Sequence, residues 1–387
     1  MQIPQMSPFL CPTTIHMGVG SYIKVADSLR QWEAKRLMIL LDGALVDTPF
    51  YTDVKRLLEQ EVDQFSVFTD IEPDPSANTV EKAYNQCRES GATALLAIGG
   101  GSTMDVAKAV GILATNGGRI HDYEGIEKFH TRPLPLIAIP TTAGTGSEVS
   151  GSCVITDTEK NLKMSIRHAS LNPADVAILD PLALRTVPAH VAAHSGLDAF
   201  VHAFESYVSR LANPFTDAIN LHALQLISGN IRQFVANRNN LDAGLNMLCG
   251  SALAGMAFGL TGLGNVHCMA RFVGAYFHLS HGLSNALCLP HVAAFNMPAN
   301  PTKFARVAQA MGEHTEGLPE LHAARRAVDA ISALCSDLGI PGRLRDAAVT
   351  ADKLDEMAAL CVQANYNRWN PRDTSKRDFQ ELFHRAY

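Results

Sequence analysis

The spacing of apolar residues changes near residue 187, and this change limits the folds open to the chain. Before it, short apolar runs alternate with stretches of helical spacing, one through the 50s and one after Ser102. The apolar runs are residues 36–42, 94–98 and 134–139. Such alternation predicts a largely parallel sheet covered by helices.

After Pro188 the pattern is almost wholly helical, with long Ala- and Leu-rich stretches. The clearest are residues 191–210, 216–237, 241–259 and 323–338. A chain of 387 residues is too long for one typical core. We therefore expect an α/β domain over 1–186 and an all-helical domain over 187–387.

Composition excludes several classes of protein. A net charge of −6 leaves no basic footprint for nucleic acid. No window of about 18 apolar residues suggests a membrane span, and Met1 to Leu10 lack the pattern of a signal peptide, which predicts a cytoplasmic protein. Eight scattered cysteines without a CxxC pair are typical of reduced thiols, and we interpret Cys268 and Cys288 as packing residues.

Gly99, Gly100, Gly101 and Ser102 stand between an apolar run and a helical pattern. Glycines at a strand-to-helix turn let the backbone approach a ligand, and the start of the new helix attracts a phosphate. We expect the pyrophosphate of a dinucleotide there. The segment also fits a tight connection capped by Ser102, because it is neither GxGxxG nor a P-loop.

Two other segments follow apolar runs. Asp42 can bond ribose hydroxyls and repel a 2′-phosphate, which favours NAD over NADP, although Asp42-Gly43 equally fits ordinary turn chemistry. Residues 140–148, Pro-Thr-Thr-Ala-Gly-Thr-Gly-Ser-Glu, offer hydroxyl and backbone donors to a nucleotide, although such a loop can simply cap a helix.

Asp198 and His202 are four residues apart in a helical pattern, so their side chains lie on one face and can hold the same divalent ion. His267 and His281 would complete the set, because a break at 278–280 lets two helices meet there. One carboxylate and three neutral imidazoles leave a divalent ion about one positive charge, enough to polarise an alcohol or carbonyl oxygen. Chance spacing also produces such pairs among 15 histidines. We interpret other histidines as structural, among them His168, His194, His222 and His291.

Together these motifs resemble the iron-containing, or group III, alcohol dehydrogenases over nearly the full chain. The resemblance rests on 99–102 with Asp105, on 140–148, on 196–205, and on 262–267 through 281–286. It implies a dehydroquinate synthase-like fold, with a dinucleotide-binding α/β domain over 1–186, a metal-binding helical domain over 187–387 and the active site in the cleft between them. It also implies that Fe²⁺, or Zn²⁺ in some members, is held by Asp198, His202, His267 and His281.

The resemblance also implies NAD(H) as the cofactor and a homodimer or larger homo-oligomer as the assembly. Its cofactor contacts carry over to Asp42, Gly100, Gly101, Ser102, Asp105, Thr141, Thr142, Thr145, Lys163 and Thr186. The expected activity is reversible hydride transfer between nicotinamide and a primary alcohol or its aldehyde.

Arg271 departs from the family, many members of which carry histidine at this position. One helical turn after His267, it would place a permanent cation beside the metal. Its guanidinium either binds a carboxylate, sulfonate or phosphonate group of the substrate, or pairs with a nearby acid or the cofactor pyrophosphate.

Two relatives with other chemistry and one non-enzymatic function are alternatives to this hypothesis. A dehydroquinate-synthase-like lyase needs a basic cluster that the sequence lacks, and the complete set of four ligands argues against a metal-free, maleylacetate-reductase-like enzyme. A non-enzymatic binding module would not need both a dinucleotide loop and an open metal site.

Overall fold

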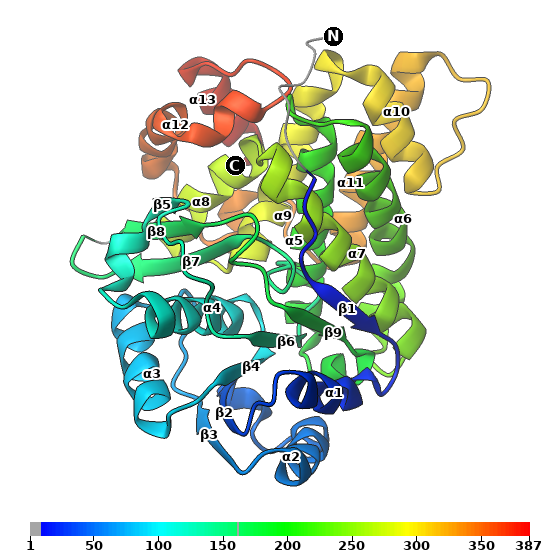
Figure 1. Cartoon of the computed structure of the whole chain (residues 1–387). Helices are drawn as coiled ribbons and strands as arrows, with labels where there is room; N and C mark the ends of the chain where they lie inside the picture. Colours follow the sequence, from blue (N-terminus) through cyan, green and yellow to red (C-terminus); the bar gives the residue numbers. More distant parts are fainter. Residues whose placement is uncertain (1–8, 161) are drawn as a thin grey trace. The chain divides into compact units, whose positions relative to one another are not determined.

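In the computed structural model, residues 9–160 and 162–387 are described, and they form two compact units (Figure 1). The α/β unit comprises residues 10–142 and 146–187. The helical unit comprises Phe9, residues 143–145 and residues 188–387.

A six-stranded sheet with the order β1-β9-β6-β4-β2-β3 forms the centre of the α/β unit. Every neighbouring pair in it is parallel. Its strands are β1 (Thr14–Met17), β2 (Arg36–Leu41), β3 (Gln64–Phe68), β4 (Ala94–Gly99), β6 (Leu136–Pro140) and β9 (Val176–Leu179). The helices of this unit are α1 (Lys24–Gln31), α2 (Pro49–Glu61), α3 (Ala77–Ser90) and α4 (Gly101–Asn116). The predicted parallel sheet covered by helices is confirmed.

Both faces of the sheet are buried, which explains why the strands read as continuous apolar runs. In β2, Leu37 and Ile39 belong to a core with residues of α1 and α2. The alternate residues Met38 and Leu40 belong to a second core with residues of α3 and α4. Side chains therefore alternate between the faces with the period of two that a strand imposes.

The chain reverses its direction of travel across the sheet between β2 and β4. β3 adds to one side of β2, and β4 then adds to the other side. In open parallel sheets ligands bind beyond the carboxyl ends of the strands at such a switch point. Asp42 follows β2 and Gly100 follows β4 at this edge.

A second, three-stranded sheet with the order β5-β8-β7 was not predicted. It consists of β5 (Gly125–Ile126), β7 (Ser152–Asp157) and β8 (Leu162–Arg167). β7 and β8 pair antiparallel, and Cys153, Ile155, Met164 and Ile166 join the core on the α3 and α4 side.

The helical unit begins with α5 (Ala189–Val208). It continues with α6 (Pro214–Ala236), α7 (Leu241–Thr261), α8 (Asn265–Phe277), α9 (His281–Asn296), α10 (Pro301–Ala310), α11 (Glu320–Asp337), α12 (Leu354–Gln363) and α13 (Lys376–Ala386). The four helical stretches read from the sequence correspond to α5, α6, α7 and α11, and the predicted break at 278–280 separates α8 from α9.

One of these helices changes an expectation from the sequence. By length and composition α7 is apolar enough to cross a membrane, so the statement that no such window exists is wrong. This is weak evidence for a membrane span, because 56% of the window is buried inside the protein and core helices pass the same test.

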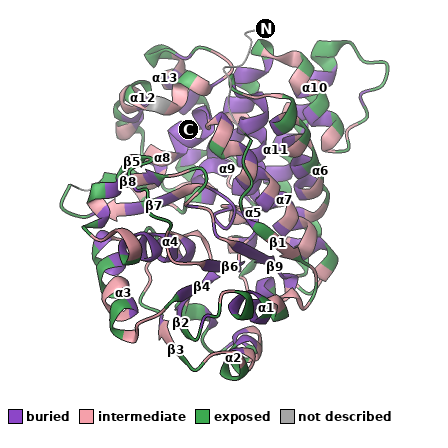
Figure 2. Ribbon diagram, in the orientation of Figure 1, coloured by how far each residue is buried: buried purple, intermediate pink, exposed green. Residues whose placement is uncertain are grey.

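α5 and α9 approach closely, and both are largely buried (Figure 2). The contact passes through Gly282, where an added Cβ would lie 2.2 Å from the His194 carbonyl oxygen. Only a residue without a side chain fits this separation. The contact also sets the position of His281, the neighbour of Gly282 in α9.

We predict that Gly282→Ala lowers the free energy of unfolding by about 1–3 kcal/mol, because the new methyl group forces α9 away from the α5 backbone. The matched control is Gly229→Ala on the exposed side of α6, where an added Cβ meets nothing within 4 Å. That variant should stabilise the protein by about 0.4–1 kcal/mol. Urea unfolding followed by circular dichroism measures both. Equal stability of the two variants would contradict the packing described.

Candidate functional site

Three polar side chains occupy one face of α5. Asp198, His202 and Glu205 follow each other at spacings of four and three residues, which places them in one row along the helix. They are 3%, 6% and 2% exposed. α5 is otherwise built mainly from apolar residues, so this buried polar row requires partners from other elements.

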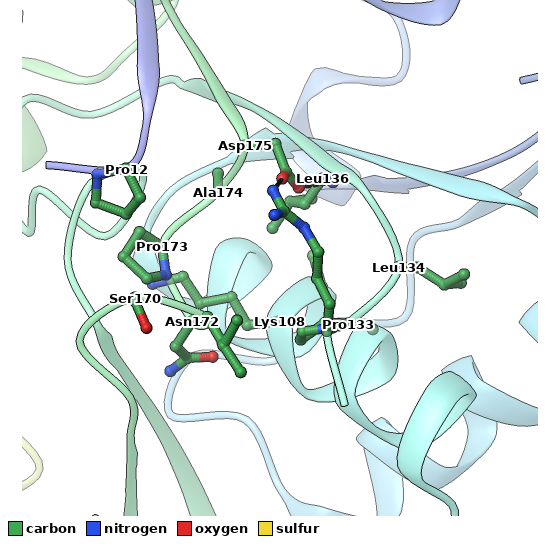
Figure 3. Close-up of a pocket in the computed structure, with 14 residues that line it drawn as sticks. Pro12, Lys108, Pro133, Leu134, Leu136, Ser170, Asn172, Pro173, Ala174 and Asp175 are labelled. Carbon is green, nitrogen blue, oxygen red and sulfur yellow. Dashed lines mark hydrogen bonds and ion pairs between the residues drawn. The ribbon is translucent and has the colours of Figure 1, made fainter. Parts of the chain in front are cut away.

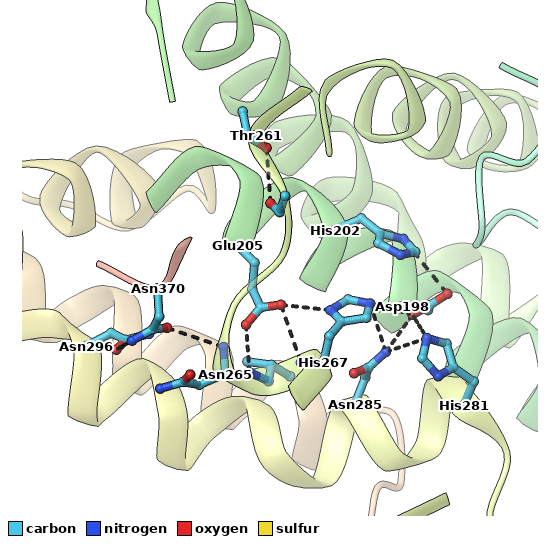
Figure 4. Close-up of polar contacts among 12 residues, drawn as sticks. Asp198, His202, Glu205, Thr261, Asn265, His267, His281, Asn285, Asn296 and Asn370 are labelled. Atoms are coloured by element: carbon cyan, nitrogen blue, oxygen red, sulfur yellow. Dashed lines mark hydrogen bonds and ion pairs between the residues drawn. The ribbon is translucent and has the colours of Figure 1, made fainter. Parts of the chain in front are cut away.

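α8 and α9 supply those partners (Figure 4). Asp198 Oδ1 lies 3.7 Å from His267 Nε2 and 3.6 Å from His281 Nε2. Ligand atoms of these three residues lie within 4.8 Å of one another. A tetrahedral site with bonds of about 2.1 Å separates its donor atoms by about 3.4 Å, so the three donors fit a divalent cation in chemistry and spacing.

Burial and charge set the protonation of this group. Burial lowers the pKa of His267 well below its usual range, with further lowering from the neighbouring imidazoles. Burial also lowers the pKa of His202. Burial would raise the pKa of Asp198, but the three imidazoles and the Asn285 amide together lower it. An ionised carboxylate beside neutral imidazoles is the state that metal binding needs.

His202 lies beside the three converging residues, but is not one of them. Its Nδ1 is 3.9 Å from Asp198 Oδ2 and 3.4 Å from the carbonyl oxygen of Gly144. Its ring stacks between Phe258 and His267, at centroid distances of 4.5 Å and 4.7 Å. The structure therefore brings three of the four predicted ligands to one point and places the fourth against them.

Asn285 also converges on this point, four residues after His281 in α9. Its Nδ2 donates to Asp198 Oδ1 at 2.7 Å and lies 3.3 Å from His267 Nε2 and 3.2 Å from His281 Nε2. Its Oδ1 is buried without a hydrogen-bond partner among the described residues. The orientation of the amide therefore follows from the acceptors that its nitrogen faces. Because Asn285 Nδ2 lies within 3.3 Å of Asp198 Oδ1, His267 Nε2 and His281 Nε2, these three atoms must face the same region.

Arg271 lies in α8, one turn after His267, and is partly exposed. Within residues 9–160 and 162–387, no acid lies within ion-pair distance of its guanidinium, and no hydrogen bond from it is found. Its Cζ lies 6.0 Å from the centroid of the Phe272 ring. A pairing of Arg271 with a nearby acid is thus not found in the described part of the chain.

Several predicted cofactor residues share the carboxyl edge of the large sheet. Asp42 follows β2, Gly99 ends β4, Gly100 and Gly101 begin α4, and Thr141 follows β6. Ser102 and Thr142 come directly after these residues, and Thr186 lies beyond the 3-10 helix that follows β9. Asp42 Oδ1 accepts a hydrogen bond from the Ala44 amide, so turn chemistry is present at Asp42 as well.

Three other predicted cofactor residues are placed differently. The Asp105 carboxylate accepts from Ser147 Oγ and from the Val154 amide, both at 3.0 Å, which ties α4 to the loop and to β7. Lys163, in β8, pairs with Asp74 at 2.6 Å. Thr145 belongs to the helical unit, whereas Thr141 and Thr142 belong to the α/β unit.

A cavity in the α/β unit lies away from this carboxyl edge (Figure 3). Its walls include Leu136, which begins β6, and Asp175, which precedes β9, so it lies at the amino ends of these strands. It has about 20 Å³ of space for the centres of water-sized molecules. Because one water needs roughly 10–15 Å³ by such a measure, the cavity is too small for a nucleotide.

Comparison with known proteins identifies the family. The chain matches the family model for iron-containing alcohol dehydrogenase over residues 12–181, and the C-terminal model of the Fe-containing alcohol dehydrogenase family over residues 192–387. It is 38% identical to 1,3-propanediol dehydrogenase of Citrobacter freundii, over 99% of each chain. It is 34% identical to NAD-dependent methanol dehydrogenase of Bacillus methanolicus, over 98% of this chain and 100% of the other. A crystal structure of 1,3-propanediol oxidoreductase matches with a TM-score of 0.96 and 36% identity, over 99% of this chain and 100% of the other.

The fold and the converging Asp and His residues thus define a metal-dependent oxidoreductase scaffold. The chain belongs to the iron-containing alcohol dehydrogenase family. The resemblance and the fold class that the motifs indicated are confirmed.

Sequence reasoning missed Glu205 and Asn285, although a signal for each was present. Glu205 follows Asp198 by seven residues and Asn285 follows His281 by four, spacings that place side chains on one helix face. The rule that paired Asp198 with His202 would have found both.

We predict that Asn285→Leu lowers the free energy of unfolding of the metal-free protein by about 1–3 kcal/mol, because the buried Asp198 carboxylate loses a donor. Urea unfolding in the presence of a chelator measures the change. Asn230→Leu, at a partly exposed position of α6, is the control. Asn230 Nδ2 donates to the Leu226 carbonyl and its Oδ1 accepts from Asn246 Nδ2, so this variant loses amide hydrogen bonds without removing a donor to a buried carboxylate. Equal losses in the two variants would show that the donor to Asp198 has no special weight.

Proposed function

We propose that this chain is a metal-dependent, NAD(H)-linked alcohol dehydrogenase and aldehyde reductase, with Asp198, His202, His267 and His281 as the ligands of iron or zinc. The convergence of Asp198 with His267 and His281 carries the proposal. Carboxylate and imidazole donors suit both metals. When bound, such a cation supplies Lewis-acid polarisation of the substrate oxygen.

The residues of the chain set the charge of this centre. Asp198 provides one negative charge, and burial lowers the pKa of His202 and His267, which favours their neutral imidazoles. His281 has a side-chain exposure of 50%, so the centre is open on its side. Such exposure gives a substrate a route to the centre.

The cofactor proposal rests on the edge of the large sheet. Asp42, Gly99–Ser102, Thr141 and Thr142 lie at the carboxyl ends of β2, β4 and β6, around the switch point. The N–H groups at the start of α4 suit a pyrophosphate, and Asp42 disfavours a 2′-phosphate. We also propose four further cofactor residues, Asp105, Thr145, Lys163 and Thr186. A methanol dehydrogenase that is 34% identical is named as NAD-dependent.

The assembly and the domain boundary belong to the same proposal. We propose a homodimer or larger homo-oligomer, with an α/β domain over 1–186 and a helical domain over 187–387. Sedimentation velocity measures the assembly.

A relative of the chain and the surroundings of Arg271 each suggest a substrate class. We propose small primary alcohols and their aldehydes as the general class, because a relative that is 38% identical is named for 1,3-propanediol. Anionic aldehydes are a second candidate, favoured by a guanidinium without an acidic partner among the described residues, one turn from a metal ligand. A carboxylate, sulfonate or phosphonate would supply the missing partner.

We predict that the purified protein oxidises NADH with short aldehydes only when it carries Fe²⁺ or Zn²⁺, because substrate polarisation needs the cation. His281→Ala should lower kcat/KM by more than about 100-fold, since loss of a residue that merely supports a ligand already costs about 10–100-fold. His222→Ala, at an exposed histidine of α6, is the matched control. NADH absorbance measures turnover. Full activity of metal-free protein or of His281→Ala would contradict the proposal.

We predict that Arg271→Met lowers kcat/KM for an anionic aldehyde by about 10–100-fold, since hydrogen bonds to charged groups contribute about 1.5–3 kcal/mol. For a neutral aldehyde of the same length, kcat/KM should change by less than threefold, which corresponds to a free-energy difference of about 0.6 kcal/mol or less. Arg271→Lys keeps the charge and should recover part of the loss. Equal losses for both aldehydes would rule out recognition of the anionic group.

A further inference from the structure

Glu205 is a buried carboxylate that contacts His267 but is not among the proposed metal ligands. Its side chain is 2% exposed. Oε2 lies 2.7 Å from His267 Nδ1 and 3.4 Å from the His267 amide, and Oε1 lies 2.6 Å from the Val266 amide (Figure 4). Gly264 leaves room for this approach, because a Cβ there would lie 3.0 Å from Glu205 Oε1.

The surroundings of Glu205 fix the direction of its bond to His267. Both carboxylate oxygens face backbone N–H groups, which can only donate. These donors lie at the start of α8, where the helix dipole also favours negative charge. Burial raises the pKa of Glu205 to about 7, whereas these backbone donors act against that rise and favour the carboxylate. As a carboxylate, Glu205 accepts on both oxygens, and the hydrogen between it and His267 belongs to Nδ1.

A proton on Nδ1 leaves the lone pair of a neutral imidazole on Nε2. Nε2 is the His267 atom that faces Asp198 and His281 Nε2 in the converging group. We infer that Glu205 is a positioning residue that holds His267 as the Nδ1–H tautomer with its Nε2 lone pair directed at the metal position. This inference rests on the proposed metal site, and it adds a residue whose role precedes metal binding.

A purely structural role for Glu205 is the alternative, because its bond to Val266 also caps α8. Asn370 offers the comparison. Its Oδ1 lies 3.3 Å from the Asn265 amide at the first residue of α8, and within 2.9 Å of the Asn296 side chain, without a bond to His267. A variant at Asn370 thus loosens the same helix end and leaves the imidazole contact in place.

The first experiment reads the tautomer directly in full-length, metal-free protein. ¹⁵N NMR of protein labelled at histidine nitrogens, with His267 assigned from its absence in His267→Ala, should show the proton on Nδ1. Glu205→Gln should shift His267 toward the Nε2–H form. The amide has one acceptor oxygen for three donors, which are the Val266 N–H, the His267 N–H and Nδ1–H, and its NH₂ favours an Nδ1 that accepts. Asn370→Ala should keep the Nδ1–H form.

The second experiment measures affinity by titration of Zn²⁺ against a competing chelating dye. Glu205→Gln should weaken binding by about 10–100-fold, the usual effect of losing a carboxylate that orients a ligand histidine. In a His267→Ala background the same change should alter affinity by less than threefold, because the contact through which it acts is gone. Asn370→Ala should lower thermal stability and leave affinity within threefold of wild type.

The outcomes separate this inference from the proposed function. A proton on Nε2 of His267 in the wild-type protein overturns the inference without any variant, even if Glu205→Gln fails to fold. Unchanged affinity in folded Glu205→Gln overturns it, as does an equal loss in the His267→Ala background or in Asn370→Ala. Failure of wild-type protein to bind Zn²⁺ or Fe²⁺ counts instead against the proposed metal site, and the tautomer measurement stands apart from that result.

Discussion

The carboxylate of Asp198 is 3% exposed and lies inside a helical unit with an apolar core. Removing an ion from water costs several kcal/mol unless neighbouring charges and donors compensate it. Asn285 supplies a hydrogen-bond donor to this carboxylate. His202 on the same helix, His267 on α8 and His281 on α9 lie within 3.9 Å of it, where a bound cation would supply the compensating charge. Three helices therefore have to meet at one point. The close contact of α9 with α5 through Gly282 is the packing that this requirement demands.

The α/β unit solves a similar problem with a cation. Lys108 lies inside α4 with 3% exposure, and its Nζ donates to Ser147 Oγ and to the carbonyl oxygens of Ser150 and Ser152. Asp105, one turn earlier, accepts from Ser147 and from the Val154 amide. The two side chains together tie the loop after β6 to the helix that starts at the glycine turn. Burying a charge here fixes the shape of the edge where a dinucleotide is proposed to bind.

Elements with a strong period could be predicted from the sequence, and those that depend on distant partners could not. β2 and β4 are buried on both faces and read as apolar runs, and α5 to α7 are long and rich in Ala and Leu. β7 and β8 are half apolar, and β8 alternates apolar and polar residues as a half-buried strand does. Both are short and lie outside the alternation of strands and helices that predicts the parallel sheet. The pairing of Lys163 with Asp74 joins residues 89 positions apart and leaves no local signal in the sequence. Glu205 and Asn285 had a local signal, but their roles depend on contacts with other helices.

The spacing of the two carboxylates on α5 explains the orientation of the His267 ring. Seven residues separate Asp198 from Glu205, which is about 10.5 Å along a helix. His267 lies between them, with Nδ1 at 2.7 Å from Glu205 and Nε2 at 3.7 Å from Asp198. One residue more or fewer between the carboxylates would turn one of them about 100° around the helix, away from the ring. The seven-residue spacing on α5 thus sets the positions of both ring nitrogens of His267, which belongs to α8. The geometry of the site therefore depends on α5 as much as on the ligands themselves.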